Sequence, residues 1–197
     1  MTVRLDLFCE DAAHESCARA IVRRCAREER RAVNLRPASA RSGIPRLKKE
    51  LNAFQRVLRS SAGAPDLLIV MVDANDVGVA ARRREVGEAL DESLIPAFVI
   101  AVPDPCVERW LLADPTSFTG LLGAEPESGA TNDRDAWRHR LLEALDRGGH
   151  IVTQGGSEFA EEIVEAMDLY RAGRAVPSLG AFVGDLRGAL KRVASDD

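Results

Sequence analysis

The 197-residue sequence has no long apolar run, and this absence argues against a membrane-spanning helix. Its longest uninterrupted apolar stretch is Leu67–Val72, far shorter than the roughly 20 residues that cross a bilayer. Residues 1–8 carry Asp6 within an apolar stretch and show no cleavage-site pattern, so we expect no secretory signal. These absences predict a cytoplasmic protein without a membrane partner.

Paired cysteines and aromatic residues are also scarce, and each shortage excludes a class of site. The four cysteines, Cys9, Cys17, Cys25 and Cys106, form no Cys-x-x-Cys pair, which argues against a zinc site and predicts buried, reduced thiols. One tyrosine and two tryptophans leave few rings to stack on single-stranded bases. No Gly-x-x-x-x-Gly-Lys motif is present, which excludes ATP hydrolysis through a phosphate loop.

The charge is unevenly distributed along the chain. Residues 1–60 hold 14 basic and 7 acidic residues, whereas the remainder holds 13 basic and 24 acidic ones, and the net charge is −4. A basic segment of this kind can present a positive face to a polyanion such as nucleic acid. Only three of the basic residues are lysines. The alternative explanation is that the base composition of the genome favours arginine codons, so that the many arginines do not indicate a partner.

The sequence does contain a repeated alternation of strand and helix patterns. Strands are predicted over residues 3–8, 32–37, 66–72 and 97–102, and helices over 12–31, 45–58 and 79–91. The third and fourth strand segments are apolar throughout, as expected for parallel strands that are covered on both faces. The sequence therefore predicts an α/β fold, with a four-stranded, mainly parallel sheet flanked by helices as in Rossmann-like proteins.

After Pro105 the strand patterns end and only helical patterns remain. We expect helices over residues 106–113, 134–147, 158–171 and 179–193. This change divides the chain into a predicted α/β domain over residues 1–114 and a helical C-terminal extension over residues 115–197, which packs on the same core.

Acidic residues follow three of the four predicted strands. Glu10 follows the first strand, Asp73 follows the third, and Glu108 lies one helical turn beyond the end of the fourth. Ligands of open α/β sheets bind at this edge, so we expect these carboxylates to converge there around a positive charge. Oxygen donors without neighbouring His or Cys favour a hard cation, Mg²⁺ or Mn²⁺. The predicted metal ligands are Glu10, Asp73, Asn75, Asp76 and Glu108.

Helix capping is the alternative explanation for some of these acids. Both Asp11 and Asp76 precede predicted helices, which they could cap. Glu108 lies inside its predicted helix, where capping does not explain it. The three histidines, His14, His139 and His150, lack metalloprotease spacing and are expected at the surface.

A strand ending in glutamate, a helix, and an apolar strand ending in an Asp-x-Asp-like turn resemble the TOPRIM fold of topoisomerases, primases and overcoming-lysogeny-type nucleases. The segment Ile100–Pro103, followed by Val107–Asp114, looks more narrowly like small stand-alone bacterial TOPRIM-like proteins. Those proteins are often encoded beside an ATPase in phage-defence-type operons. Residues 176–182 also resemble their closing helix, so the likeness spans most of the chain.

This resemblance implies three catalytic and metal-binding acids: Glu10, Asp73 and Glu108. The sequence departs from the family pattern at two positions. Asp11 stands where the family has a glycine, and Asn75 stands where it has a second aspartate, with Asp76 one place along. Asn75 keeps an oxygen ligand but lacks the negative charge, so metal affinity should fall unless Asp76 reaches the ion.

The resemblance and the acidic edge together predict Mg²⁺-dependent phosphodiester hydrolysis of DNA or RNA, with an ATPase as partner protein and a homodimer left open. The side chains expected to bind phosphate are Arg82, Arg83, Arg84, Arg46, Lys48 and Lys49. The alternative for residues 82–84 is a solvated helix face. A second hypothesis is a regulatory or nucleic-acid-binding subunit of an ATPase complex, with a degraded metal site. A third hypothesis, a small-molecule phosphohydrolase, agrees less well with the sequence. Its nucleophilic Asp-x-Asp would follow an early strand, whereas the first strand here ends in Glu10.

Overall fold

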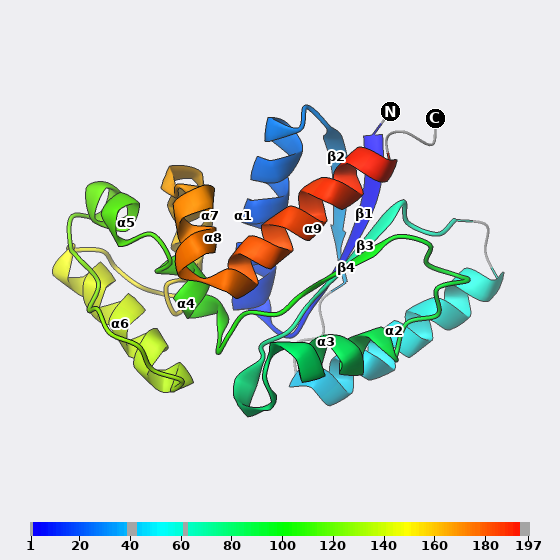
Figure 1. The fold of residues 1–197 in the computed structure, drawn as a ribbon, viewed down its shortest axis with the longest axis horizontal. Coiled ribbons are helices and arrows are strands. Elements are labelled where there is room, and N and C mark those ends of the chain that lie inside the picture. Colours follow the sequence, from blue (N-terminus) through cyan, green and yellow to red (C-terminus); the bar gives the residue numbers. More distant parts are fainter. Residues whose placement is uncertain (1, 39–42, 61–62, 194–197) are drawn as a thin grey trace.

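A four-stranded parallel sheet forms the centre of the molecule (Figure 1). The structure is a computed structural model that describes residues 2–38, 43–60 and 63–193. The strands are β1 (Thr2–Cys9), β2 (Ala32–Pro37), β3 (Leu67–Met71) and β4 (Phe98–Ala101). They are arranged in the order β2-β1-β3-β4, and every neighbouring pair is parallel. The Rossmann-like α/β fold expected from the alternating patterns is therefore confirmed.

Helices cover both faces of this sheet. The helices are α1 (Ala12–Glu28), α2 (Gly43–Ser60), α3 (Val79–Gly87), α4 (Val107–Leu111), α5 (Pro115–Leu122), α6 (Arg134–Arg147), α7 (Ala160–Ala166), α8 (Leu169–Ala175) and α9 (Pro177–Val193), with 3-10 turns η1 (Asn75–Val77) and η2 (Ser157–Phe159). Helices α2 and α3 pack on one face, and α1 and α9 pack on the other (Figure 1). None of the described helices is both long and apolar enough to cross a membrane.

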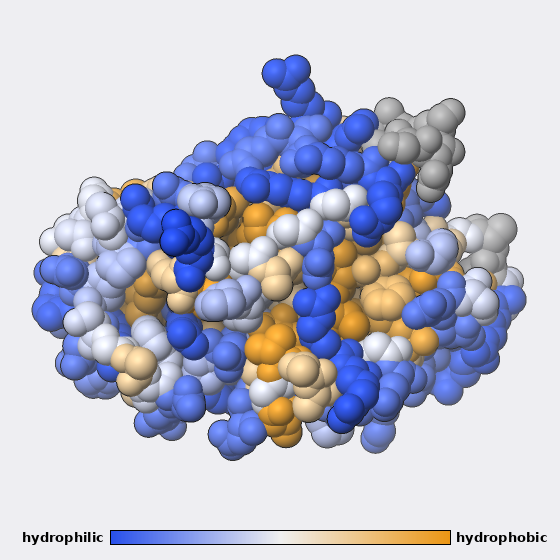
Figure 2. All heavy atoms as spheres, viewed as in Figure 1, coloured by the Kyte–Doolittle hydropathy of each residue, from blue (hydrophilic) through white to orange (hydrophobic). Residues whose placement is uncertain are grey.

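The buried side chains form two clusters that follow from the alternation of residues in the strands. Phe8, Val70 and Ile100 point toward α2 and α3, whereas Leu7 and Ile69 point toward α1 and the C-terminal helices. All four cysteines are buried and free, as predicted from their spacing. Figure 2 shows apolar residues reaching the surface between α9 and the α2–α3 layer, where β4 forms the edge of the sheet.

Two helix predictions in the second half of the chain were incomplete. The helix predicted over residues 158–171 is interrupted, because Asp168 accepts hydrogen bonds from the backbone N–H groups of Tyr170 and Arg171 and so begins a new helix, α8. Helix α5 was not predicted. It begins with Asp114, whose side chain accepts from Ser117 N, followed by a proline at the first helical position.

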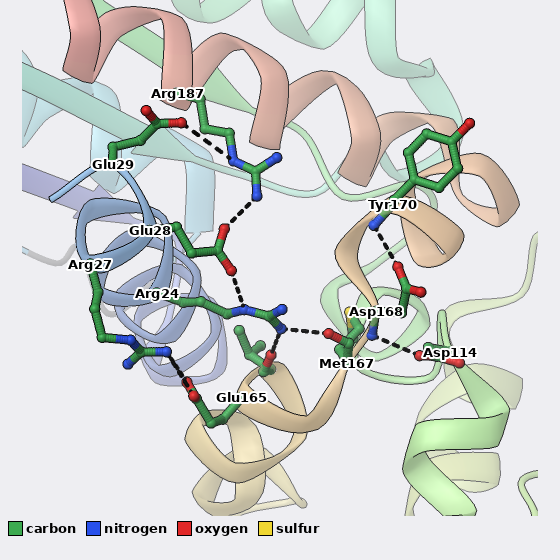
Figure 3. Close-up of polar contacts among 11 residues, drawn as sticks. Arg24, Arg27, Glu28, Glu29, Asp114, Glu165, Met167, Asp168, Tyr170 and Arg187 are labelled. Atoms are coloured by element: carbon green, nitrogen blue, oxygen red, sulfur yellow. Dashed lines mark hydrogen bonds and ion pairs between the residues drawn. The ribbon is translucent and has the colours of Figure 1, made fainter.

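Ion pairs and hydrogen bonds join the carboxyl end of α1 to α7 and α9 (Figure 3). The Arg24 guanidinium donates to the backbone oxygens of Val164 and Met167, which lie at the end of α7. Arg27 pairs with Glu165 at 2.7 Å. Helix α7 begins at Ala160, far along the chain from the last strand, which ends at Ala101. These contacts therefore tie the C-terminal helices to the first βα unit.

Candidate functional site

The candidate site lies where the connections of the sheet change direction. After β1 the chain continues to β2 on one side of the sheet, and after β3 it continues to β4 on the other side. The carboxyl ends of β1 and β3 therefore border the switch point, where such folds bind ligands. Glu10 directly follows β1, and Asp73 follows β3 by two residues. The backbone N–H of Asp73 donates to Glu10 Oε2 at 3.2 Å. The structure thus brings these two acids together.

His14 completes this cluster from the first turn of α1. Its ring is only 1% exposed, and its nitrogens lie 2.7 Å from Asp11 Oδ1 and 2.8 Å from Asp73 Oδ1. Burial alone lowers the pKa of His14, but the charge of Asp73 and the hydrogen bonds to both aspartates outweigh it and raise the pKa to about 10. The imidazolium can therefore donate to both carboxylates at neutral pH. The prediction that His14 lies at the surface was wrong.

The Asp73 carboxylate is completely buried, and its second oxygen approaches a second cation. Asp73 Oδ2 lies 2.9 Å from Arg134 Nη2 at the start of α6. This approach is close but lacks hydrogen-bond alignment, so Oδ2 has no hydrogen bond in the described structure. The contact is therefore an ion pair without a hydrogen bond. His14 and Arg134 are the positive groups that convergent carboxylates require.

Glu108 lies nearby but outside this cluster. It is 6% exposed and accepts from Arg138 Nε at 3.3 Å. Burial raises the pKa of the Cys17 thiol most, and the negative charges of Glu108 and Asp73 raise it further. Both acids therefore lie close to this thiol. Arg134 and Arg138 are one helical turn apart on α6, so one face of this helix supplies a cation to each acid.

The turn after β3 presents its two polar residues differently. Asn75 has a positive φ of 47° and a buried Oδ1 that has no hydrogen-bond partner in the described structure. Asp76 is exposed, and neither η1 nor α3 has a side-chain cap, so the alternative that Asp76 caps a helix is not supported. Asp11 does cap α1, because its side chain accepts from His14 N at 3.0 Å.

A divalent cation fits the donors that the structure assembles here. Glu10, His14 and Asp73 each offer a ligand atom, and these atoms lie within 4.8 Å of one another. Two buried oxygens without hydrogen bonds, Asp73 Oδ2 and Asn75 Oδ1, add acceptors that a cation could satisfy. The prediction of Mg²⁺ or Mn²⁺ assumed that no histidine was close. An imidazole among the donors favours Mn²⁺ over Mg²⁺, and His14 must release its proton to coordinate.

Most of the basic residues predicted to bind phosphate are paired with acids. Arg82 is buried, donates from Nε to the backbone oxygen of Asp73 at 3.0 Å, and pairs with Glu85, so it supports the turn that carries Asp73. The other ion pairs are Arg83–Asp185, Arg46–Glu50 and Lys48–Glu85. Arg84 and Lys49 are exposed and form no ion pair with another described residue. Among the residues that the structure describes, His14, Arg134 and Arg138 pair with the acids of the site.

The family of the chain is identified by residues 9–187, which match a domain of unknown function, DUF4276. The chain belongs to the DUF4276 family. No curated protein and no solved structure matches it. The DUF4276 match includes Glu10, His14, Asp73, Glu108, Arg134 and Arg138, so the whole candidate site lies within the domain. Its function must be argued from this site.

Proposed function

We propose that this DUF4276 protein is a cytoplasmic, metal-dependent hydrolase of phosphodiester bonds in DNA or RNA. One observation carries the proposal: Glu10, His14 and Asp73 converge at the switch point of the sheet, and the fully buried Asp73 retains an oxygen without a hydrogen bond. A buried carboxylate held among two cations and a second acid is costly to assemble, and it is a typical feature of a functional site.

In this proposal Glu10, Asp73 and His14 hold Mn²⁺ or Mg²⁺, with Asn75 as a further oxygen donor. The bound cation supplies charge neutralisation at the phosphate and a more acidic water. Glu10 is more exposed than Asp73, so it is the acid that can accept a proton from water. Arg134, whose side chain is 41% exposed, and Arg138 can bind the phosphate oxygens of the substrate. Asp11 orients the His14 ring.

The TOPRIM resemblance supports the same chemistry. Glu10 and Asp73 occupy the positions that the resemblance assigns to the metal-binding acids, and both lie at the carboxyl ends of neighbouring parallel strands. We therefore extend the proposal to a TOPRIM-like nuclease that acts with an ATPase partner in phage defence.

One observation favours a second candidate function. His14 and Arg134 already balance the charge of Asp73 without a metal ion. A regulatory or nucleic-acid-binding subunit with a degraded metal site would have this property.

Nuclease assays with Asp73→Asn and a matched control decide between these functions. We expect the wild-type protein to cleave plasmid, single-stranded DNA or tRNA only when Mn²⁺ or Mg²⁺ is present. Asp73→Asn should lower the rate at least about 100-fold, because it removes a charged metal ligand. Asp135→Asn changes an exposed acid in the first turn of α6 and should retain the wild-type rate.

Circular dichroism of each variant checks that the fold is retained. Equal cleavage by Asp73→Asn would show that the catalytic site lies elsewhere. Absence of cleavage by the wild type with either metal, with and without an ATPase partner, would instead favour the regulatory function.

A further inference from the structure

A hollow of about 320 Å³ is lined in part by α4, the helix that carries Glu108. Residues of α4, α5, α6 and α8 line it, together with residues 125–130 of the loop before α6. Its apolar wall includes Leu112, Pro115 and Val176. Its charged residues are Arg109, Glu125 and Glu127, and Glu127 forms an ion pair with Arg140 at 3.7 Å. This volume is at the lower end of the range of small-molecule sites, and the mixed lining is typical of them.

The loop wall of the hollow is fixed by side chains of α6. Arg147 donates to the backbone oxygen of Glu125 at 2.8 Å, and Arg140 donates to that of Gly129 at 2.6 Å. Trp137 Nε1 donates to the backbone oxygen of Thr131 at 2.9 Å. Three hydrogen bonds within eight residues hold this loop in place, so a ligand would not have to order it on binding.

Arg109 is the basic residue that lines this hollow. It is half-buried, its guanidinium lies 5.5 Å from the ring centre of Trp137, and its one hydrogen bond goes to the backbone oxygen of Asp104 at 2.9 Å. No carboxylate in the part of the chain that the structure describes forms an ion pair with it. Its remaining N–H groups are therefore available to an anionic ligand.

A second hollow of about 290 Å³ adjoins the first, and both are lined by Arg109 and Val176. The second hollow is also lined by Asp104, which follows β4, and by Val79, which follows the Asn75 turn. Arg109 thus stands between the first hollow and the edge of the sheet that carries the carboxylates. An extended anionic ligand could pass from one to the other across this guanidinium.

We propose that the first hollow binds one nucleotide of the substrate strand, and that this nucleotide carries an amino-bearing base. Its phosphate pairs with Arg109, and its base packs on Leu112, Pro115 and Val176. The Glu125 carboxylate at the rim accepts a hydrogen bond from the exocyclic amino group. This assignment rests on the proposed nuclease function, because it names the nucleotide that would lie next to the cleaved bond.

Calorimetric titration with adenosine 5′-monophosphate, without metal, tests the assignment. Adenosine and ribose 5-phosphate serve as probes that lack the phosphate or the base. We expect Arg109→Gln to weaken binding of the monophosphate at least about tenfold and to leave adenosine binding unchanged, because only the charge-assisted contact is lost. Arg56→Gln removes an exposed arginine of α2 as a charge-matched control and should bind the monophosphate as the wild type does.

Unchanged binding of the monophosphate to Arg109→Gln would overturn the proposal, as would ribose 5-phosphate binding as tightly as the nucleotide. The same protein is assayed for cleavage, so the two proposals fail separately. Cleavage without nucleotide binding would reject the hollow alone. Binding without metal-dependent cleavage, retained in Asp73→Asn, would keep the nucleotide site and reject the nuclease.

Discussion

Asp73 is balanced by two cations that lie far apart in the sequence. His14 lies in the first turn of α1 and Arg134 is the first residue of α6, yet both contact the same carboxylate. Removing either partner of a buried ion pair leaves the other charge uncompensated, which costs more than the pair itself contributes. The stability of the fold and the charge of the site are therefore coupled through this one side chain.

The pH dependence of stability should reveal the His14–Asp73 contact. The folded-state pKa of His14, about 10, lies above its ordinary value of 6.5, so its contribution is fully present below pH 6.5 and is lost as the pH rises through 10. At pH 6 we expect His14→Gln to lower the free energy of unfolding by about 3 kcal/mol. This deficit should shrink toward pH 10, as measured by urea denaturation at several pH values.

Two controls separate this effect from other titrations. The buried cysteines also lose their contribution as the pH rises, but they do so in both proteins and cancel in the difference. His139→Gln changes a histidine whose side chain is 69% exposed and should alter stability by less than about 0.5 kcal/mol. A deficit for His14→Gln that stays constant from pH 6 to pH 10 would contradict the assigned pKa.

The sequence identified only part of this cluster. Glu10 and Asp73 could be found because each follows an apolar strand, and strand ends meet at one edge of a parallel sheet. His14 could not, since a single histidine on an amphipathic helix carries no signal that distinguishes burial from exposure. Arg134 could not either, because its position depends on how α6 packs against α4, which no local pattern encodes.

At the scale of elements, the junction of α8 and α9 depends on two glycines. A Cβ on Gly173 would lie 2.9 Å from the Gly180 Cα, and a Cβ on Gly180 would lie 2.7 Å from the Gly173 carbonyl oxygen. These distances are shorter than carbon atoms tolerate, so the two backbones can approach each other only because both residues lack side chains. The approach allows α8 to pack closely against the start of α9.

Alanine substitutions in α9 should have opposite effects at two positions. Gly180→Ala should destabilise the protein by about 1–3 kcal/mol, since a backbone must move to admit the methyl group. Gly184→Ala, one turn further along an exposed part of the helix, should stabilise it by up to about 1 kcal/mol, because alanine favours the helix and nothing lies within 4 Å of the new atom. Thermal unfolding measures both, and a stabilised Gly180→Ala would disprove the close packing.

Strands were easier to predict than the helices of the second half. Segments such as Leu67–Met71 are short and uniformly apolar, and few other structures accommodate such a segment between turn signals. The break before α8 was missed because Ile163, Met167 and Leu169 continue the apolar pattern across it. Helix α5 was missed although Asp114 and Pro115 give a start signal, since its short, Gly- and Thr-containing sequence has low helix propensity.

For the whole molecule, one cluster of buried side chains extends from the sheet into the C-terminal helices. Trp110 on α4 stacks on Phe182 of α9 with ring centres 5.5 Å apart, and its indole N–H donates to Ser178 Oγ. Asp114, also buried, receives two hydrogen bonds from Arg171 on α8. These contacts cross the boundary predicted near residue 114.

We expect the chain to unfold in a single transition. Tryptophan fluorescence reports mainly on the regions of α4 and α6, whereas far-ultraviolet circular dichroism reports on all helices. The two urea curves should have the same midpoint, because the shared core couples the sheet to the C-terminal helices. Separate midpoints would show that the chain does not unfold as a single unit.

The four-residue spacing between Arg134 and Arg138 limits how this region can change in evolution. Inserting or deleting one residue between them would rotate one arginine about 100° around the helix axis, away from its acid. The loop before α6 faces no such phase constraint. Relatives should therefore vary in length ahead of α6 but preserve the Arg-x-x-x-Arg spacing, and they should lose the two arginines together with the acids they face.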